Sequence, residues 1–283
     1  MNTRRGMPKV ITLRLTSRCN ANCKPCFAPK NIPEMPLSLL RKLFDFLVEN
    51  GITAILLTGG EPLLREDFAE VVGELKRRGF KIFLDTNADF FSKHRRIIAR
   101  CVDVIGLPVD FADKSYRGSE NLNNVLRTLE CLAKAKKRPK IRIGTVVTKD
   151  NFEDLVKIGN LIKKYPISVW KLYQFTPQES NAIRNKRFLE ITEDQFDLAV
   201  KQVKSKFSRF FGVVISKRTD RNRAYFYIES DGRVVMPVDD MNICKLVSIG
   251  NVFDKDIFDK WASWVSRKSH IANAKATFMR KFR

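Results

Sequence analysis

Three cysteines near the start of the chain have a spacing typical of a metal centre. Cys19, Cys23 and Cys26 lie in the segment CNANCKPCF, and the whole chain holds only six cysteines. Structural zinc is bound by four ligands, usually arranged as two pairs, and no second pair is present in this sequence. Three thiolates on one loop instead fit an iron–sulfur cluster in which one iron stays open to a further ligand. We therefore predict that these three cysteines bind such a cluster.

The remaining cysteines and histidines do not complete a tetrahedral site. Cys101 and Cys131 lie within apolar patterns that are typical of small buried side chains. Cys244 is isolated, and neither His94 nor His270 lies near another candidate ligand in the sequence. These residues alone leave open the alternative of a non-enzymatic iron–sulfur or zinc-binding module.

A second motif follows the next predicted strand. Gly59, Gly60, Glu61 and Pro62 come directly after the apolar run AILLT. Glycines let a ligand approach the backbone closely, and a carboxylate accepts hydrogen bonds from an ammonium group. The alternative is an ordinary turn between a strand and a helix. The cysteine loop lies about one strand–helix unit upstream, which favours a shared binding site.

Two cations occupy strands that are otherwise apolar. Arg142 lies in KIRIGTVV and Lys171 lies in SVWKLYQF. A strand covered on both faces is normally apolar, so a charge there needs a phosphate or a carboxylate as its partner. We predict that both side chains point into the interior of the fold and bind an anionic substrate. The alternative is that both face solvent at a sheet edge.

A regular alternation of strands and helices carries these residues. Nearly continuous apolar strands separated by amphipathic helices predict a parallel sheet covered by helices. A doubly wound sheet and a partial barrel both fit this pattern. The predicted strands are KVITLRL, AILLTG, KIFLDT, VDVIGLPV, KIRIGTVV and SVWKLYQF, and the helices between them include SLLRKLFDFLVENG, EDFAEVVGELKRRG, NLNNVLRTLECLAKAKK and NFEDLVKIGNLIKKY.

The pattern changes after Pro177. A capping box from Thr192 to Gln195 begins a helix, and AYFYIESDGRVVMPV predicts a hairpin that turns at residues 230–232. The segment DIFDKWASWVSRK predicts a final helix, which is followed by a basic tail. We therefore divide the chain into a core over residues 1–178 and a small α+β extension over residues 179–283.

The composition indicates the kind of partner. Lys and Arg number 53 against 31 acidic residues, which gives a net charge of +22. This excess favours an anionic partner such as a nucleotide or RNA, although dispersed cations also fit a solvated surface. No apolar run is long enough to cross a membrane, and the N-terminus lacks the apolar core of a secretory signal. Together with the clustered cysteines, these features predict a cytoplasmic location.

The order of the two motifs resembles the signature of the radical SAM superfamily. Cys19-x3-Cys23-x2-Cys26 follows the first predicted strand, and GGEP follows the second. The resemblance implies a partial (β/α)6 TIM-type barrel, a [4Fe–4S] cluster bound by the three cysteines, and S-adenosylmethionine (SAM) bound at the open iron. It also implies a flavodoxin- or ferredoxin-type electron donor. The further cofactor-binding positions that the resemblance implies are Phe27, Gly59, Gly60, Glu61, Pro62, Thr86, Asn87, Asp110 and Arg117.

Within this superfamily the chain is similar to viperin-like enzymes, which dehydrate a nucleoside triphosphate. The segments CNANCKPCF, IRIGTVVTKDNFEDL and VWKLYQF carry this resemblance, and Arg142 and Lys171 are the substrate contacts that it implies. The predicted activity is reductive cleavage of SAM to a 5′-deoxyadenosyl radical, which abstracts hydrogen from a nucleotide in an oxygen-sensitive enzyme. Modification of RNA or of a peptide is the alternative, because YFYIESDGRVVMP is closer to the tails of peptide-modifying maturases.

Overall fold

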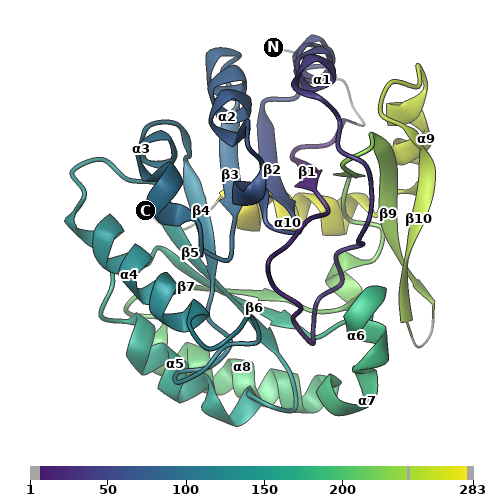
Figure 1. Ribbon diagram of the computed structural model, residues 1–283. Helices are drawn as coiled ribbons and strands as arrows, with labels where there is room; N and C mark the ends of the chain where they lie inside the picture. Colours follow the sequence, from purple (N-terminus) through teal and green to yellow (C-terminus); the bar gives the residue numbers. More distant parts are fainter. Residues whose placement is uncertain (1–6, 241–242, 279–283) are drawn as a thin grey trace.

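A single ten-stranded sheet organises the molecule. The structure is a computed structural model that describes residues 7–240 and 243–278. The strand order is β10-β9-β8-β1-β2-β3-β4-β5-β6-β7, and the sheet curves into a barrel that stays open between β7 and β10 (Figure 1). The strands are β1 Ile11–Thr16, β2 Ala54–Gly59, β3 Lys81–Asp85, β4 Val104–Pro108, β5 Lys140–Val147, β6 Val169–Gln174, β7 Gly212–Ser216, β8 Tyr227–Ile228, β9 Arg233–Asp240 and β10 Ile243–Asn251.

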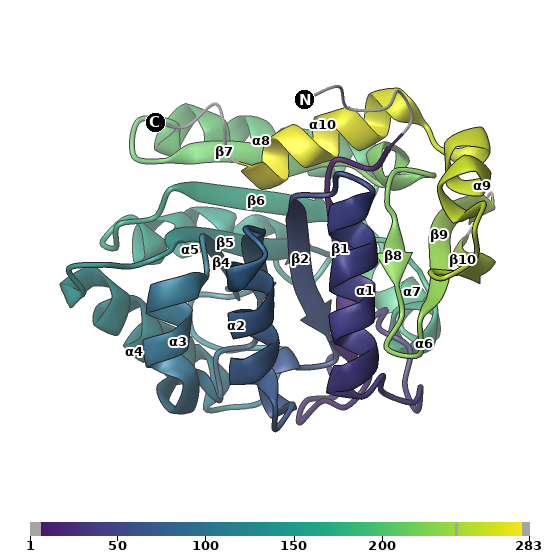
Figure 2. The ribbon, with the colours of Figure 1, turned by 90° about the horizontal axis from the view of Figure 1, so that it is seen from above.

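Helices cover the outer face of this sheet (Figure 2). Strands β1 to β7 pair in parallel with their neighbours, as the apolar strands of the sequence predicted. The partial barrel is therefore confirmed. The helices are α1 Leu37–Glu49, α2 Phe68–Arg77, α3 Phe91–Cys101, α4 Asn121–Lys134, α5 Leu155–Ile162, α6 Ser180–Arg184, α7 Lys186–Leu189, α8 Glu193–Phe207, α9 Ile257–Trp264 and α10 Arg267–Phe278.

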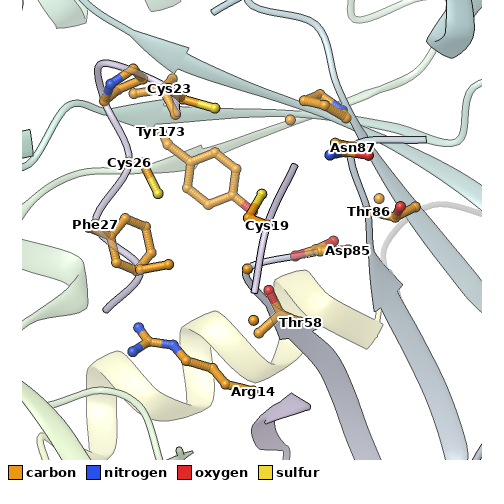
Figure 3. Close-up of a pocket in the computed structure, with 18 of the residues that line it drawn as sticks. Arg14, Cys19, Cys23, Cys26, Phe27, Thr58, Asp85, Thr86, Asn87 and Tyr173 are labelled. Carbon is orange, nitrogen blue, oxygen red and sulfur yellow. The ribbon is translucent and has the colours of Figure 1, made fainter. Parts of the chain in front are cut away.

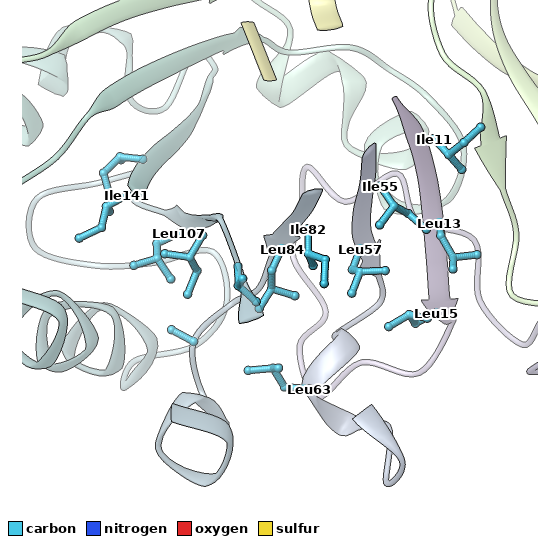
Figure 4. Close-up of a cluster of buried hydrophobic side chains, with 14 of the residues drawn as sticks. Ile11, Leu13, Leu15, Ile55, Leu57, Leu63, Ile82, Leu84, Leu107 and Ile141 are labelled. Carbon is cyan, nitrogen blue, oxygen red and sulfur yellow. The ribbon is translucent and has the colours of Figure 1, made fainter. Parts of the chain in front are cut away.

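The two faces of each strand have different tasks. Ile11, Leu13 and Leu15 of β1 pack beneath the helices, together with matching residues of β2, β3, β4 and β5 (Figure 4). Each fully buried Leu or Ile contributes roughly 1.5–3 kcal/mol to folding. The residues between them, Thr12 and Arg14, point to the opposite face and line a cavity inside the barrel. The period of two along a strand thus separates the core from the site.

The C-terminal residues complete the same sheet. Strand β8 pairs in parallel with β1, where Thr12 lies opposite Tyr227. Strands β8 and β9 form the predicted hairpin, and the capping box of Thr192 and Gln195 at the start of α8 is also confirmed. The division of the chain at residue 178 stays a prediction, because the sheet runs through both parts without a break.

Several elements differ from the sequence prediction. Helices α3, α6 and α7 and strands β7 and β10 were not predicted, and the single final helix is in fact two, α9 and α10, separated at residues 265–266. Helix α10 lacks a clear apolar stripe and packs through Ala274 against buried side chains inside the barrel, among them Val10, Ala54 and Phe83. The end of the predicted basic tail, residues 279–283, lies outside the described residues. Within the part of the chain that is described, no helix is long and apolar enough to cross a membrane.

Candidate active site

The cavity inside the barrel brings together most of the predicted site residues. It has a volume of about 320 Å³. Figure 3 shows the three cysteines on one side and Thr58, Asp85 and Thr86, which come from strand ends, on the other. The predicted residues that line it are Cys19, Cys23, Cys26, Phe27, Gly59, Gly60, Thr86, Asn87, Arg117, Arg142 and Lys171. Three others, Glu61, Pro62 and Asp110, are buried behind its wall.

The cysteine loop is held in place by a distant part of the chain. Asn181 of α6 donates through Nδ2 to Asn22 Oδ1 at 2.8 Å and to the Cys23 carbonyl oxygen at 3.0 Å. The backbone N–H of Ala182 donates to the Cys26 carbonyl oxygen at 3.0 Å. The loop between β1 and α1 therefore takes its shape from residues beyond the barrel strands, which fixes where its thiols lie.

The donor set fits an iron–sulfur cluster better than a single metal ion. All six cysteines are free, and Cys101, Cys131 and Cys244 do not line the cavity. Among the residues that the structure describes, no three Cys, His, Asp or Glu side chains converge as ligands of one ion. Each cysteine of an iron–sulfur cluster of this kind would bind a different iron, so the three thiols need not converge on one metal ion. Three thiols on one loop at the cavity wall fit such a cluster.

Gly59 and Gly60 allow two stretches of backbone to touch. A Cβ atom on Gly59 would collide with the Thr16 carbonyl oxygen, and one on Gly60 would collide with that of Arg18. Gly59 also has a φ of +146°, which favours glycine. The N–H groups of Gly60 and Glu61 donate to these same carbonyl oxygens at 2.7 and 2.8 Å. The glycines thus dock the end of β2 on the start of the cysteine loop, and both remain at the cavity wall.

Glu61 lies behind this wall and is surrounded by donors. Its Oε1 accepts hydrogen bonds from Thr86 Oγ1 at 2.7 Å and from the Leu63 N–H at 3.0 Å, and its Oε2 accepts one from the Asn87 N–H at 2.7 Å. Burial raises the pKa of Glu61 to about 7, although these donors oppose the shift. The carboxylate ties β2 to the end of β3 and positions Thr86 and Asn87 at the cavity. Its predicted contact with the methionine ammonium group of SAM stays a prediction.

Asp110 likewise supports a neighbour. Its Oδ2 forms an ion pair with Arg117 Nη1, and its Oδ1 accepts a hydrogen bond from the Val146 N–H at 2.9 Å. Arg117 reaches the cavity wall. Burial raises the pKa of Cys23 to about 11, and the positive charge of Arg117 opposes that shift. The pair therefore places a fixed cation beside the cysteine loop.

Arg142 points into the barrel and meets a carboxylate there. Its Nη2 forms an ion pair with Asp85 Oδ1 across Gly106, which lies between them in the strand register. A Cβ atom at Gly106 would collide with Asp85, so glycine leaves the space for this pair. The alternative of an exposed sheet edge is wrong, because both Arg142 and Lys171 are buried.

Lys171 and Arg221 are cations without a carboxylate partner in the described residues. Lys171 Nζ lies 4.6 Å from the centre of the Tyr173 ring and has no hydrogen-bond partner in the part of the chain described here. Burial, assisted by the charge of Arg142, lowers the pKa of Lys171 to about 7. Arg221 donates to Gln174 O and Thr176 Oγ1, while its Nε is buried without a partner. Both side chains line the cavity.

The C-terminal part contributes a wall of the cavity that the sequence did not predict. Arg221, Tyr225 and Tyr227 line the cavity, and so does Arg14 of β1. Arg14 carried a usable signal, because a charge in ITLRL breaks an apolar strand in the same way as Arg142 does. The two tyrosines follow a period of two in AYFYI, but nothing in the sequence indicates which face of that hairpin is covered.

Comparison with known proteins identifies the family. The family model of the radical SAM superfamily matches residues 13–162. The chain belongs to this superfamily. It is therefore an enzyme of a family that uses a [4Fe–4S] cluster and SAM, and the alternative of a non-enzymatic metal-binding module is wrong.

Two relatives are similar to this radical SAM protein over different lengths. An S-adenosylmethionine-dependent nucleotide dehydratase from Selenomonas ruminantium is 28% identical over 281 residues, which cover 91% of this chain and 97% of that protein. A GTP 3',8-cyclase from Aquifex aeolicus is 27% identical over 178 residues, which cover 57% of this chain and 55% of that protein.

Solved radical SAM structures share the fold. A structure of anSMEcpe with bound AdoMet and the Cp18Cys peptide has a TM-score of 0.69 at 20% identity, and covers 93% of this chain and 84% of that one. SuiB of Streptococcus suis bound to S-adenosylmethionine has a TM-score of 0.68 at 14% identity, with 93% of this chain and 67% of that chain covered.

Proposed function

We propose that this radical SAM enzyme acts on a nucleotide and removes water from it. The observation that carries the proposal concerns two cations, Lys171 and Arg221, in the wall of the cavity that the three cysteines also line. Neither cation has a carboxylate partner among the described residues. A buried cation without a counter-charge is costly, and a phosphate group supplies that charge. The name of the Selenomonas ruminantium relative, a nucleotide dehydratase, supports the same substrate class.

The residues of the chain have separate tasks in this proposal. When bound, the cluster supplies one electron to SAM, whose cleavage gives the 5′-deoxyadenosyl radical that abstracts hydrogen from the nucleotide. Cys19, Cys23 and Cys26 would hold the cluster. Lys171 and Arg221 bind the phosphates, while Arg142, which was predicted to bind the substrate, is paired with Asp85 and holds the wall beside them.

The cofactor contacts carried over from the family belong to the same proposal. SAM is expected along the wall formed by Phe27, Gly59, Gly60, Thr86, Asn87 and Arg117. Glu61, Pro62 and Asp110 support that wall from behind. The electron donor is of the flavodoxin or ferredoxin type, and the enzyme works in the reducing cytoplasm.

The test is a SAM-cleavage assay on the anaerobically reconstituted enzyme with dithionite as reductant. Nucleoside triphosphates, tRNA and peptide pools are supplied separately, and 5′-deoxyadenosine is measured. We expect nucleoside triphosphates to stimulate its formation and to yield a product that has lost one water. Stimulation by tRNA or by peptides alone would replace this proposal with RNA or peptide modification.

A pair of lysine variants links the assay to the cavity. Lys171→Ala is expected to retain the cluster and SAM binding but to lose most of the stimulation by nucleotides. Lys164→Ala is the matched control, because Lys164 is exposed and does not line the cavity. Equal activity in the two variants would contradict the role of Lys171.

A further inference from the structure

Arg14 is a buried cation that the proposed function does not yet use. Its side chain is 4% exposed, and its Nη1 donates to Glu229 Oε1 at 2.5 Å. Its guanidinium carbon lies 5.7 Å from the centre of the Phe27 ring and 5.0 Å from that of Tyr227. Figure 3 shows the side chain reaching from β1 toward Phe27. The ion pair and the two rings therefore hold the guanidinium group in one orientation.

One nitrogen of this group has no partner. Arg14 Nη2 is buried and makes no hydrogen bond within the described part of the chain, although Arg14 lines the cavity. Burying a donor without an acceptor costs free energy, because the donor loses its hydrogen bonds to water and forms none in the protein. A molecule bound in the cavity that offers an oxygen or ring-nitrogen acceptor at this point would satisfy it.

The charges of the wall show which part of a nucleotide fits here. Arg14 is neutralised by Glu229, and its neighbours Phe27 and Tyr227 are aromatic. Lys171 and Arg221, by contrast, have no carboxylate partner in the described residues, so their part of the wall is cationic. A nucleotide has the same asymmetry, with an uncharged planar base at one end and phosphates at the other.

We infer that Arg14 Nη2 donates a hydrogen bond to an acceptor atom of a nucleobase, and that Arg14 with Tyr227 forms the base-binding subsite of the cavity, next to Phe27 on the side expected to face SAM. The inference rests on the proposed function and adds the orientation of the substrate and a residue that determines base specificity. Two bases are present in the reaction, that of the substrate and the adenine of SAM. Tyr227 stacks on Tyr225, with ring centroids 5.1 Å apart, and both rings belong to the C-terminal wall that also carries Arg221, which assigns Arg14 to the substrate.

The test measures binding rather than turnover. Nucleoside triphosphates with different bases, base-free ribose 5-triphosphate, and SAM are titrated into the anaerobically reconstituted enzyme by calorimetry. The main variant is Arg14→Lys, because Lys retains the charge beside Glu229 but has no second nitrogen to donate. Arg14→Ala is the second variant, and the visible absorbance of the cluster and the melting temperature check that each variant is folded and loaded.

Arg14→Lys is expected to lower the affinity for the preferred nucleoside triphosphate by about tenfold or more, the effect of losing a hydrogen bond from a charged donor. Its affinity for ribose 5-triphosphate and for SAM is expected to stay within about twofold of the wild type. Lys171→Ala, in contrast, is expected to weaken the binding of ribose 5-triphosphate as well.

Four results would overturn the inference. Equal losses for the base-free and base-containing triphosphates would place Arg14 among the phosphate ligands. A loss confined to SAM would assign the donor to the adenine of SAM, and unchanged nucleotide binding would leave Arg14 with a structural role only. If the wild type binds no nucleoside triphosphate at all, the proposed function fails and this inference fails with it.

Discussion

The two parts of the chain on either side of residue 178 line one cavity but differ in what they contribute. The N-terminal part supplies the three cysteines, the GGEP segment and Arg142, and it contains the whole region that matches the family model. The C-terminal part supplies Arg221, Tyr225 and Tyr227, and its residue Asn181 fixes the cysteine loop. In the proposed function, one part carries the cofactor chemistry, while the other completes the wall that binds the substrate.

This difference has a physical origin. A cluster and a sulfonium cofactor need particular residue types at fixed spacing, so the N-terminal part shows them as motifs. A substrate wall needs only donors and rings at suitable places, which a hairpin such as β8–β9 provides through its pairing with β1. The substrate class is therefore encoded more weakly in the sequence than the reaction type.

The largest effect is expected from the cluster ligands, which belong to the N-terminal part alone. Changing any one of Cys19, Cys23 or Cys26 to Ala is expected to abolish iron binding, because each thiolate binds its own iron. Iron and sulfide content and absorbance near 400 nm are the measurements. Cys244→Ala is the control from the C-terminal part. Loss of the cluster in that variant would show that the C-terminal part also supplies a cluster ligand.

Residues of the C-terminal part are expected to contribute as much to substrate affinity as residues of the N-terminal part. Arg221→Ala removes an unpaired cation from the cavity and is expected to weaken nucleoside triphosphate binding by about 10- to 100-fold, the range for hydrogen bonds to charged groups. Calorimetry with the reconstituted enzyme measures it, and SAM affinity in the same variant is the control. Unchanged nucleotide affinity would confine substrate binding to the N-terminal part.

The protonation of Lys171 gives this binding a pH dependence. The pKa of Lys171 in the free enzyme is about 7, because the side chain is buried and lies near Arg142. A phosphate binds the protonated form, so the free enzyme must take up a proton on binding above pH 7. The ratio of wild-type to Lys171→Ala affinity is expected to be highest below pH 7 and to fall by at most about tenfold per pH unit above it. A ratio that is constant from pH 6 to 9 would contradict the assignment.

A smaller effect is expected from Glu61, which joins two strands of the N-terminal part. Glu61→Gln replaces an acceptor oxygen with an NH2 group that faces the donors of Thr86 or Asn87. We expect the cluster to be retained and SAM affinity to fall by about tenfold, since the hydrogen bond that the carboxylate is predicted to accept from the ammonium group of SAM becomes a neutral one. Titration with SAM measures the effect. A variant that binds SAM like the wild type would show that GGEP is only a turn.

The smallest effect tests the contact between the two parts. Asn181→Ala removes the hydrogen bonds from α6 to Asn22 and Cys23, each of which contributes about 1 kcal/mol. The cysteine loop is then less well held, and the rate of iron loss to a chelator is expected to rise severalfold. Asn160→Ala is the matched control, because Asn160 is exposed on α5 and does not contact the loop. Equal rates in both variants would mean that the loop keeps its shape without α6.

The sequence by itself determined the family, a parallel sheet covered by helices and the residues of the cofactor motifs, while the choice of a barrel over a doubly wound sheet came from the family resemblance. The patterns that predict strands and helices are local, and the cysteine and GGEP motifs are each contiguous in the sequence. Both can therefore be recognised without knowing which strands pair. Arg142 and Lys171 were also found locally, as charges in apolar strands, and both proved to be buried.

Only the tertiary structure decided how the two parts of the chain share the site. The pairing of β8 with β1 places Tyr227 beside Arg14, and the strand register places Asp85 across Gly106 from Arg142. The hydrogen bond from Asn181 of α6 to Asn22 of the cysteine loop joins residues more than 150 positions apart. Such contacts depend on strand order and register, which are set by packing over the whole chain and leave no local signal in the sequence.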